Sequence, residues 1–162
     1  MGAITIEDGT LTELGREILE LPLEPLYSAA ILKSVDEPEY IQKDFLSIIA
    51  LMNVENLLYS KKLDKNKMGK AYARFQVKNS DHLTKLQILC GYVSAKNRNE
   101  FCKEYCVNKR AIEKVIAIRE QLRLILEQII LKRKQKASKT AAPKFNYSYK
   151  KINMQKTNMG EL

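Results

Sequence analysis

The sequence predicts a mainly α fold: a helical bundle built around one long helix, a small unit with a short β-hairpin before it, and a disordered basic tail after it. Apolar residues between Asn108 and Leu131 recur at steps of three and four, the spacing of one buried helical face. Shorter upstream stretches repeat this spacing between polar or Pro-containing turns. After Leu131 the apolar spacing vanishes, which is typical of disorder. The predicted boundaries are 1–35 for the first unit, 36–131 for the bundle and 132–162 for the tail.

The first unit is predicted from alternation and from helix-capping residues. Residues 3–6 alternate as a short strand, and residues 10–12 can return as its partner across a turn. Thr12 is suited to cap a helix that Pro22 stops, and Pro25 can open a second helix. A hairpin beside two helices resembles the end of a winged helix whose first part is missing.

Four helices are predicted for the bundle, over 38–59, 81–96, 99–106 and 108–131. Ser80 or Asp81 suits the N-cap of the second of them. Residues 61–69 are polar and predict an exposed loop, and 71–75 predict a short helical piece. The first helix has a predicted buried stripe at Ile41, Phe45, Ile48, Ile49 and Met52, and the second at Leu83, Leu86, Leu89, Cys90 and Val93.

The long helix, roughly 35 Å at about 1.5 Å per residue, carries many cations. Asn108 can cap it by accepting a hydrogen bond from the first turn. Its positive charge is sufficient to contact a phosphate backbone, but a solvated helix face explains the same pattern. The cations are Lys109, Arg110, Lys114, Arg119 and Arg123.

The net charge of +9 is unevenly distributed. Residues 1–39 hold nine acids and two bases, whereas 40–131 hold 17 bases and nine acids. Residues 132–162 hold nine bases and one acid. The basic half and the tail could bind an anionic polymer, and a basic tail alone would do so weakly and in a salt-sensitive way.

The composition indicates a soluble intracellular chain of one domain or two small ones. Its apolar fraction of 45% is ordinary, and no apolar run is long enough to suggest a membrane span or a signal peptide. Cys102 and Cys106 lie one helical turn apart, but with Cys90 and His82 they do not make a convincing zinc set. Buried free thiols are the preferred interpretation, and we expect no metal site.

No catalytic residue is predicted. The six glycines match neither a Walker A loop nor a dinucleotide fingerprint. His82 follows Asp81 at a predicted helix start without a nucleophile nearby, so a capping Asp and a His at the core edge explain the pair. Nothing in the residues supports catalysis by this chain alone.

Five local patterns resemble DEAH-box RNA helicases in order and spacing, over about residues 2–126. They are Gly2-Ala3 with Leu11-Thr12, Leu14-Gly15-Arg16 and Leu21-Pro22-Leu23-Glu24-Pro25; Phe45 to Leu51 with Val54-Glu55-Asn56; Arg74-Phe75; Asp81-His82-Leu83-Thr84; and Phe101-Cys102 with Arg110 and Ile118-Arg119-Glu120-Gln121-Leu122. The departures are Phe101 for a usual Trp, Tyr105-Cys106 for Asn-Phe, and Ser80 for Gly.

The resemblance implies the C-terminal helicase-associated region, with part of a winged helix and the helical "ratchet" bundle. It implies a long ratchet helix whose Arg110, Lys114 and Arg119 face single-stranded RNA in a channel. It further implies RecA-like helicase domains or a ribonucleoprotein as partners, and a nuclear or cytoplasmic location with the nucleus favoured. The RecA-like domains, which use ATP and magnesium, and the OB-fold are not in this sequence, so we expect a fragment, isoform or truncated product without ATPase activity.

A helical adaptor that binds a protein partner is the alternative. An incomplete winged helix would leave Leu14, Ile18 and Leu26 short of apolar neighbours, and exposed apolar patches favour association. RNA binding should weaken steeply with salt, whereas apolar docking should not.

Overall fold

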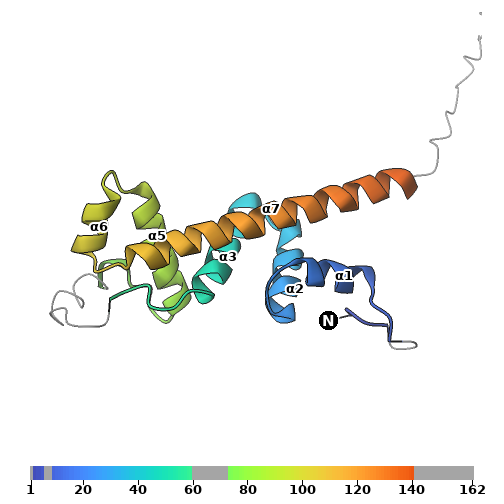
Figure 1. Cartoon of the computed structure of the whole chain (residues 1–162), viewed down its shortest axis with the longest axis horizontal. Coiled ribbons are helices and arrows are strands. Elements are labelled where there is room, and N and C mark those ends of the chain that lie inside the picture. Colours follow the sequence, from blue (N-terminus) through green and yellow to red (C-terminus); the bar gives the residue numbers. More distant parts are fainter. Residues whose placement is uncertain (1, 6–8, 60–72, 141–162) are drawn as a thin grey trace, which may run out of the picture.

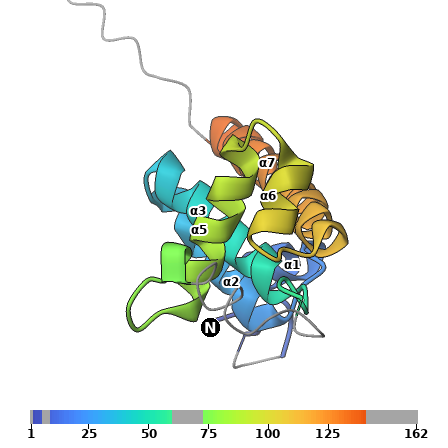
Figure 2. The same cartoon turned by 90° about the vertical axis from the view of Figure 1, so that its left-hand side faces the viewer.

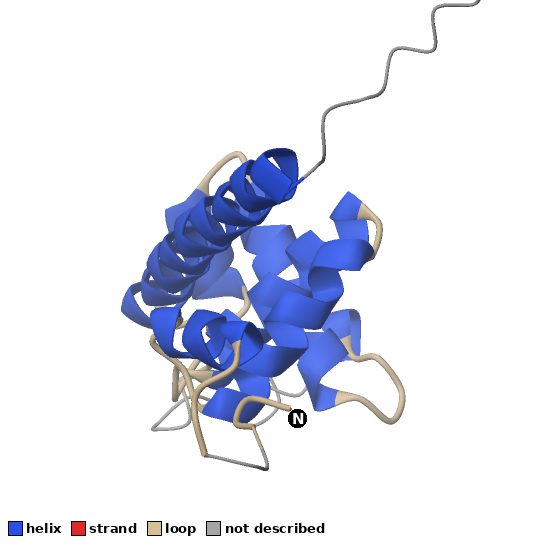
Figure 3. Ribbon diagram, turned by 90° about the vertical axis from the view of Figure 1, so that its right-hand side faces the viewer, coloured by secondary structure: helices blue, strands red, loops and turns tan. Residues whose placement is uncertain are grey.

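The computed structural model describes residues 2–5, 9–59 and 73–140, and the side chains of this part up to residue 138. It is mainly helical, and Figure 3 shows helices and loops but no strand in the described part. The elements are α1 (Glu13–Glu20), α2 (Pro25–Lys33), the 3-10 turn η1 (Ser34–Asp36), α3 (Glu39–Met52), α5 (Asp81–Ser94), α6 (Arg98–Glu104) and α7 (Lys109–Thr140). Every helix of the described part is too short or too polar to cross a lipid bilayer.

The helix starts follow the capping residues that the sequence offers. Thr12 Oγ1 accepts a hydrogen bond from the Gly15 N–H at 3.0 Å, and Ser80 Oγ accepts one from the Leu83 N–H at 3.2 Å. Ser80, rather than Asp81, is therefore the cap of α5. Pro25 occupies the first position of α2, where its missing N–H costs nothing.

The predicted hairpin is reduced to one antiparallel bridge, between Ile4 and Leu11. Around it the Thr5 N–H donates to the Thr10 carbonyl at 2.9 Å, and the Thr12 N–H donates to the Ala3 carbonyl at 3.0 Å. Of the turn predicted at residues 7–9, residues 7 and 8 lie outside the described part, and Gly9 has a positive φ of 66°. The predicted loop at 61–69 also lies outside the described part.

The helix predicted over 38–59 ends at Met52. The Asn53 side chain donates to the Ile49 carbonyl at 2.9 Å, competing with the next helical turn. Asn56 has a φ of 55°, a left-handed conformation that a continuing helix excludes. The chain then forms an isolated bridge from Leu58 to Val107, just before α7.

The buried faces of α3 and α5 differ from the predicted stripes. In α3, Ile49 is buried as predicted, but Ile41 and Met52 are exposed and Leu46 and Ala50 are buried instead. The reason is that α3 contacts both α5 and α7, so its buried surface covers two directions. In α5, Leu86 and Leu89 are buried as predicted, Leu83, Cys90 and Val93 are exposed, and Thr84, Ile88 and Tyr92 complete the buried face.

Two hydrophobic clusters lie along α7. Figure 1 shows the helices that contribute to them, with α5 and α6 at one end of α7 and α1 and α2 toward the other. The bundle cluster surrounds the first half of α7, and Figure 2 views the molecule from that end, where α5 and α6 gather. The N-terminal cluster joins α1, α2 and α3 to the second half of α7. The bundle cluster includes Leu86, Leu89, Tyr92, Phe101, Ile112 and Val115; the N-terminal cluster includes Ile18, Leu21, Ile31, Leu46, Leu122, Leu126 and Ile129.

The long helix begins and packs as predicted but continues nine residues further, to Thr140. Asn108 Oδ1 accepts from the Ala111 N–H at 3.4 Å, and Ile112, Val115, Leu122 and Ile129 are buried. Helix 132–140 overturns the expectation that disorder begins at residue 132. The remainder of the predicted tail, 141–162, lies outside the described residues.

Candidate nucleic-acid interface

Arg110 and Lys114 lie together on an exposed face of α7. They are four residues apart, about one helical turn, and both are solvent-exposed. Among the described residues neither side chain forms an ion pair. Two unpaired cations at this spacing can contact an anionic polymer.

Arg119 lies on the opposite side of α7. It follows Arg110 by nine residues, about two and a half turns at 3.6 residues per turn. Its half-buried side chain lies near Cys90 of α5, whose thiol also lies near Asp44 of α3. Burial raises the pKa of the Cys90 thiol, Asp44 raises it further, and Arg119 opposes both. The structure therefore does not bring the three predicted RNA-contacting residues onto one face.

The exposed face that begins at Arg110 loses its charge along α7. At alternating steps of four and three it continues through uncharged residues for about 27 Å, at about 1.5 Å per residue. Arg123, beside this face, is engaged by Glu120 at 2.7 Å and by Glu127. All members of the face are exposed: Arg110, Lys114, Ala117, Gln121, Leu124, Gln128, Leu131 and Gln135.

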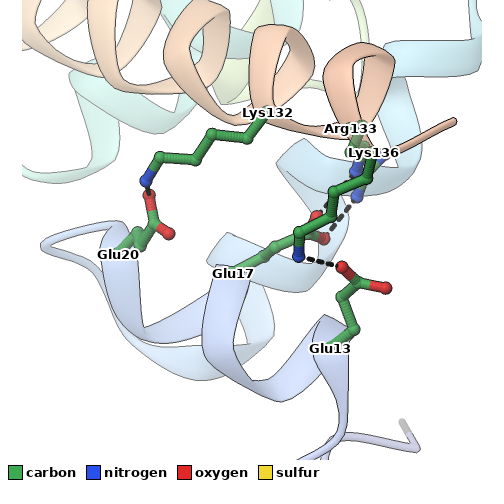
Figure 4. Close-up of polar contacts among 6 residues, drawn as sticks. All are labelled: Glu13, Glu17, Glu20, Lys132, Arg133 and Lys136. Carbon is green, nitrogen blue, oxygen red and sulfur yellow. Dashed lines mark hydrogen bonds and ion pairs between the residues drawn. The ribbon is translucent and has the colours of Figure 1, made fainter. Parts of the chain in front are cut away.

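Three basic residues at the far end of α7, Lys132, Arg133 and Lys136, face α1 (Figure 4). Lys132 pairs with Glu20 at 2.7 Å, and Lys136 pairs with Glu13. Between them Arg133 donates two hydrogen bonds to Glu17, Nε to Oε1 at 2.8 Å and Nη2 to Oε2 at 2.6 Å. We call these six residues the charge ladder. The charge ladder therefore pairs, within the chain, basic residues that the sequence had suggested for binding an external anionic polymer.

The charge ladder was missed by sequence reasoning, although its signal was present. The acids of α1 recur at steps of four and three, and Lys136 of α7 follows Arg133 by three residues and Lys132 by four. Helical side chains at those spacings share a face. Predicting the pairing also requires that residues 132–136 be helical, which the loss of apolar spacing had argued against.

Several residues of the resemblance patterns meet in one aromatic cluster rather than on the surface. The Phe75 and Phe101 ring centroids are 5.8 Å apart, and Phe101 and Tyr105 are 4.7 Å apart. The Arg74 guanidinium lies 5.6 Å from the centre of the Tyr105 ring. These positions stabilise the joint between α5 and α6, and a Cβ at Gly91 would come within 3.0 Å of the Phe75 ring.

The cysteines and the histidine do not form a site in the described part. Cys102 and Cys106 are buried free thiols as expected. Cys90 is exposed, because its position on α5 falls outside the buried face of that helix. Burial raises the pKa of the Cys102 thiol. His82 is exposed, not at the core edge. Three metal-ligating side chains meet nowhere among the residues whose positions are described.

The chain therefore folds as a small helical module in which the start of α7 carries the exposed cations Arg110 and Lys114. Comparison with curated proteins relates it to a region of DEAH-box ATP-dependent RNA helicases. It is 32% identical over 133 residues to the ATP-dependent RNA helicase DHX33 of Drosophila melanogaster, covering 81% of this chain and 19% of that protein.

Two further relatives give the same result. The probable ATP-dependent RNA helicase DHX35 of Homo sapiens is 30% identical over 129 residues, 79% of this chain and 18% of that protein. The pre-mRNA-splicing factor ATP-dependent RNA helicase prp22 of Schizosaccharomyces pombe is 27% identical over 122 residues, 75% of this chain and 10% of that protein. The chain thus spans less than a fifth of the length of these relatives. No family model matches the chain.

Proposed function

We propose that this chain is an accessory, helicase-associated region of a DEAH-box RNA helicase that helps to form a channel for single-stranded RNA. The observation that carries the proposal is the pair of exposed cations Arg110 and Lys114, which form no ion pair with a described residue, on the long helix of a helicase-related chain. Single-stranded RNA is gripped through its phosphates by positively charged grooves. Residues 1–35 would be the partial winged helix, and residues from 36 to the end of α7 the ratchet-like bundle.

In this proposal the chain has no ATPase activity of its own. ATP and magnesium would act in RecA-like domains, which would be its partners together with a ribonucleoprotein, in the nucleus or the cytoplasm. The role of the chain is to position RNA and to couple closure of those domains to strand movement. Arg119, on the far side of α7, would contact a different stretch of RNA from Arg110 and Lys114.

The test is binding of a single-stranded RNA across a salt series. Replacing both Arg110 and Lys114 by Gln should lower the slope of log K against log salt by about 1.4, since each phosphate contact on a single strand contributes about 0.7. Lys33→Gln, which removes one exposed charge from α2, is the matched control. A chain ending at Thr140 keeps every described contact and separates the binding of residues 141–162. Unchanged binding by the double variant would reject the proposal.

A protein-binding adaptor remains the second candidate function. The observation that favours it is the uncharged exposed face of α7, with Leu124 48% and Leu131 56% exposed. Leu26, which was expected to lack partners, is 61% exposed, while Ile18 is buried and Leu14 packs against the N-terminal cluster. Salt-insensitive capture of one purified helicase domain, lost in Leu124→Gln and retained in the Arg110 and Lys114 double variant, would support this function over RNA binding.

A further inference from the structure

We propose that a hollow between the α5–α6 connection and the first turn of α7 is a second anion site, which holds a phosphate group of single-stranded RNA. The hollow has a volume of about 670 Å³. The inference rests on the proposed function, because it names a further contact for the same strand. Apart from Lys109, it uses residues that neither the sequence patterns nor the face of Arg110 and Lys114 had indicated.

The hollow has an excess of positive charge. Lys96, Arg98 and Lys109 line it, against the single carboxylate of Glu113. Lys109 is also the first residue of α7, so the positive end of a 32-residue helix lies at the same place. The three cations exceed the one carboxylate by two positive charges. Beside the N-terminus of a long helix, this excess favours a ligand with one or two negative charges.

Two of these cations are held in position before any ligand arrives. The Arg98 guanidinium lies over the Tyr92 ring, 5.4 Å from its centre. Lys109 Nζ donates to Asn99 Oδ1 at 2.8 Å and lies 3.8 Å from Glu113. Neither Lys96 nor Arg98 forms an ion pair with any described residue. A phosphate would therefore meet cations whose charge is still available.

The wall of the hollow also contains a buried polar group without a close partner. Tyr92 is fully buried, and its hydroxyl makes no close hydrogen bond in the described structure. A buried hydroxyl in this state is costly and calls for an explanation. Burial raises the pKa of Tyr92, and Glu113 raises it further through its charge and a long hydrogen bond from the hydroxyl, so the hydroxyl keeps its proton and remains a donor. A phosphate that engages Lys109 takes the place of the half-exposed Glu113 carboxylate there, which leaves Glu113 available to the hydroxyl.

RNA fits the position of the hollow better than an acidic peptide. The cationic surface does not end at the hollow, because Arg110 follows Lys109 directly and Lys114 lies one turn beyond. A strand with one phosphate in the hollow therefore has a second cationic contact on the exposed face of α7. A regular polyanion can use both, and each contact should add about 0.7 to the salt slope.

The experiment is a nuclear magnetic resonance titration of the intact, nitrogen-15-labelled chain with a six-nucleotide oligouridylate. We expect amide shifts at residues 96–99 and 109, and a shift of the Arg98 side-chain Nε–H. Replacing both Lys96 and Arg98 by Gln should remove these shifts, weaken binding about tenfold and lower the salt slope by about 0.7, the contribution of the one phosphate in the hollow. The Lys33→Gln control should change neither. Retained amide dispersion shows that the variants are folded.

Separate arms use inorganic phosphate and an acidic peptide of the same charge as the RNA. Weak saturation by phosphate at the same residues, displaced by RNA, supports the site. Stronger binding of the acidic peptide than of RNA at these residues would overturn it in favour of a protein ligand. RNA shifts at Arg110 and Lys114, with residues 96–99 unmoved, would overturn this inference and leave the proposed function standing. Loss of all RNA binding outside residues 141–162 would overturn both.

Discussion

Replacing Arg133 by Gln tests the charge ladder most directly. Its guanidinium makes two parallel hydrogen bonds to Glu17, whose side chain is only 13% exposed, whereas that of Arg133 is 36% exposed. The hydrogen bonds with Glu17 raise the pKa of Arg133, and burial opposes them. The variant leaves a largely buried carboxylate without its partner.

The expected cost lies between two measured classes of ion pair. Exposed pairs contribute about 0.2–1 kcal/mol, and breaking a buried pair costs about 3–5 kcal/mol. A pair buried mainly on one side should cost about 2 kcal/mol on truncation. In a chain of this size that corresponds to a fall in Tm of about 4–8 °C. Lys132→Gln is the matched control, because Lys132 is 57% exposed and Glu20 37% exposed, and its cost should be at most about 0.5 kcal/mol.

Thermal unfolding of the two variants, with amide hydrogen exchange, measures both the cost and its location. Arg133→Gln should lose protection at residues 132–138 and keep it at 112–126, because the buried clusters are untouched. The double variant Glu17→Gln, Arg133→Gln completes a cycle that isolates the pair. An equal Tm for Arg133→Gln and Lys132→Gln would refute the argument from burial. Protection lost equally along α7 would refute the argument that the ladder fixes only its end.

Three further predictions concern the core, the thiols and pH. Leu126→Ala should cost about 2–5 kcal/mol by urea unfolding, since Leu126 is 2% exposed in the N-terminal cluster, while Leu124→Ala should cost less than about 0.5 kcal/mol; similar costs would contradict the assigned faces of α7. Maleimide should label Cys90 before the two buried thiols, and faster as the pH rises because burial and then Asp44 raise its pKa; peptide mapping that finds another cysteine first would refute this. The hydrogen bond from Lys136 lowers the pKa of Glu13, so the stability from this pair is present above the ordinary value of 4.5 and lost as pH falls through the folded value. Urea midpoints at about pH 5 and about pH 3 should therefore differ less in Glu13→Gln than in the parent chain, and an equal difference would exclude the pair as a cause.

Local chemistry predicted where helices begin better than where they end. Thr12, Ser80 and Asn108 act as caps because each needs only a short side chain and a nearby N–H. The end of α3 depends on Asn53 competing for a helical carbonyl, and the end of α7 on tertiary ion pairs with α1. The ion pairs of α7 with α1 leave a spacing signal in both segments, but that signal can be recognised only if residues 132–136 are taken to be helical.

Helical spacing predicted the buried face of α7 but not those of α3 and α5. The core of α7 follows one continuous stripe, so steps of three and four describe it well. α3 packs against α5 and α7 together, and a helix with two buried directions has no single stripe to detect. The expectation that Arg110, Lys114 and Arg119 share one face of α7 failed for a related reason. A match to the spacing of a family pattern does not show which residues share a face of the helix.

The distribution of paired charges narrows where a polyanion can bind. At the far end of α7 the exposed bases Lys132 and Lys136 face carboxylates of α1, so a phosphate at either would have to displace an existing partner, whereas the exposed Lys134 between them forms no ion pair with a described residue. At the near end Arg110, Lys114, Lys96 and Arg98 form no ion pair with a described residue, whereas Lys109 is paired with Glu113 at 3.8 Å. Binding through those four cations gains counterion release without first breaking an ion pair. The net charge of the sequence could not predict which end of α7 binds a polyanion. That depends also on which acids the fold brings against which bases.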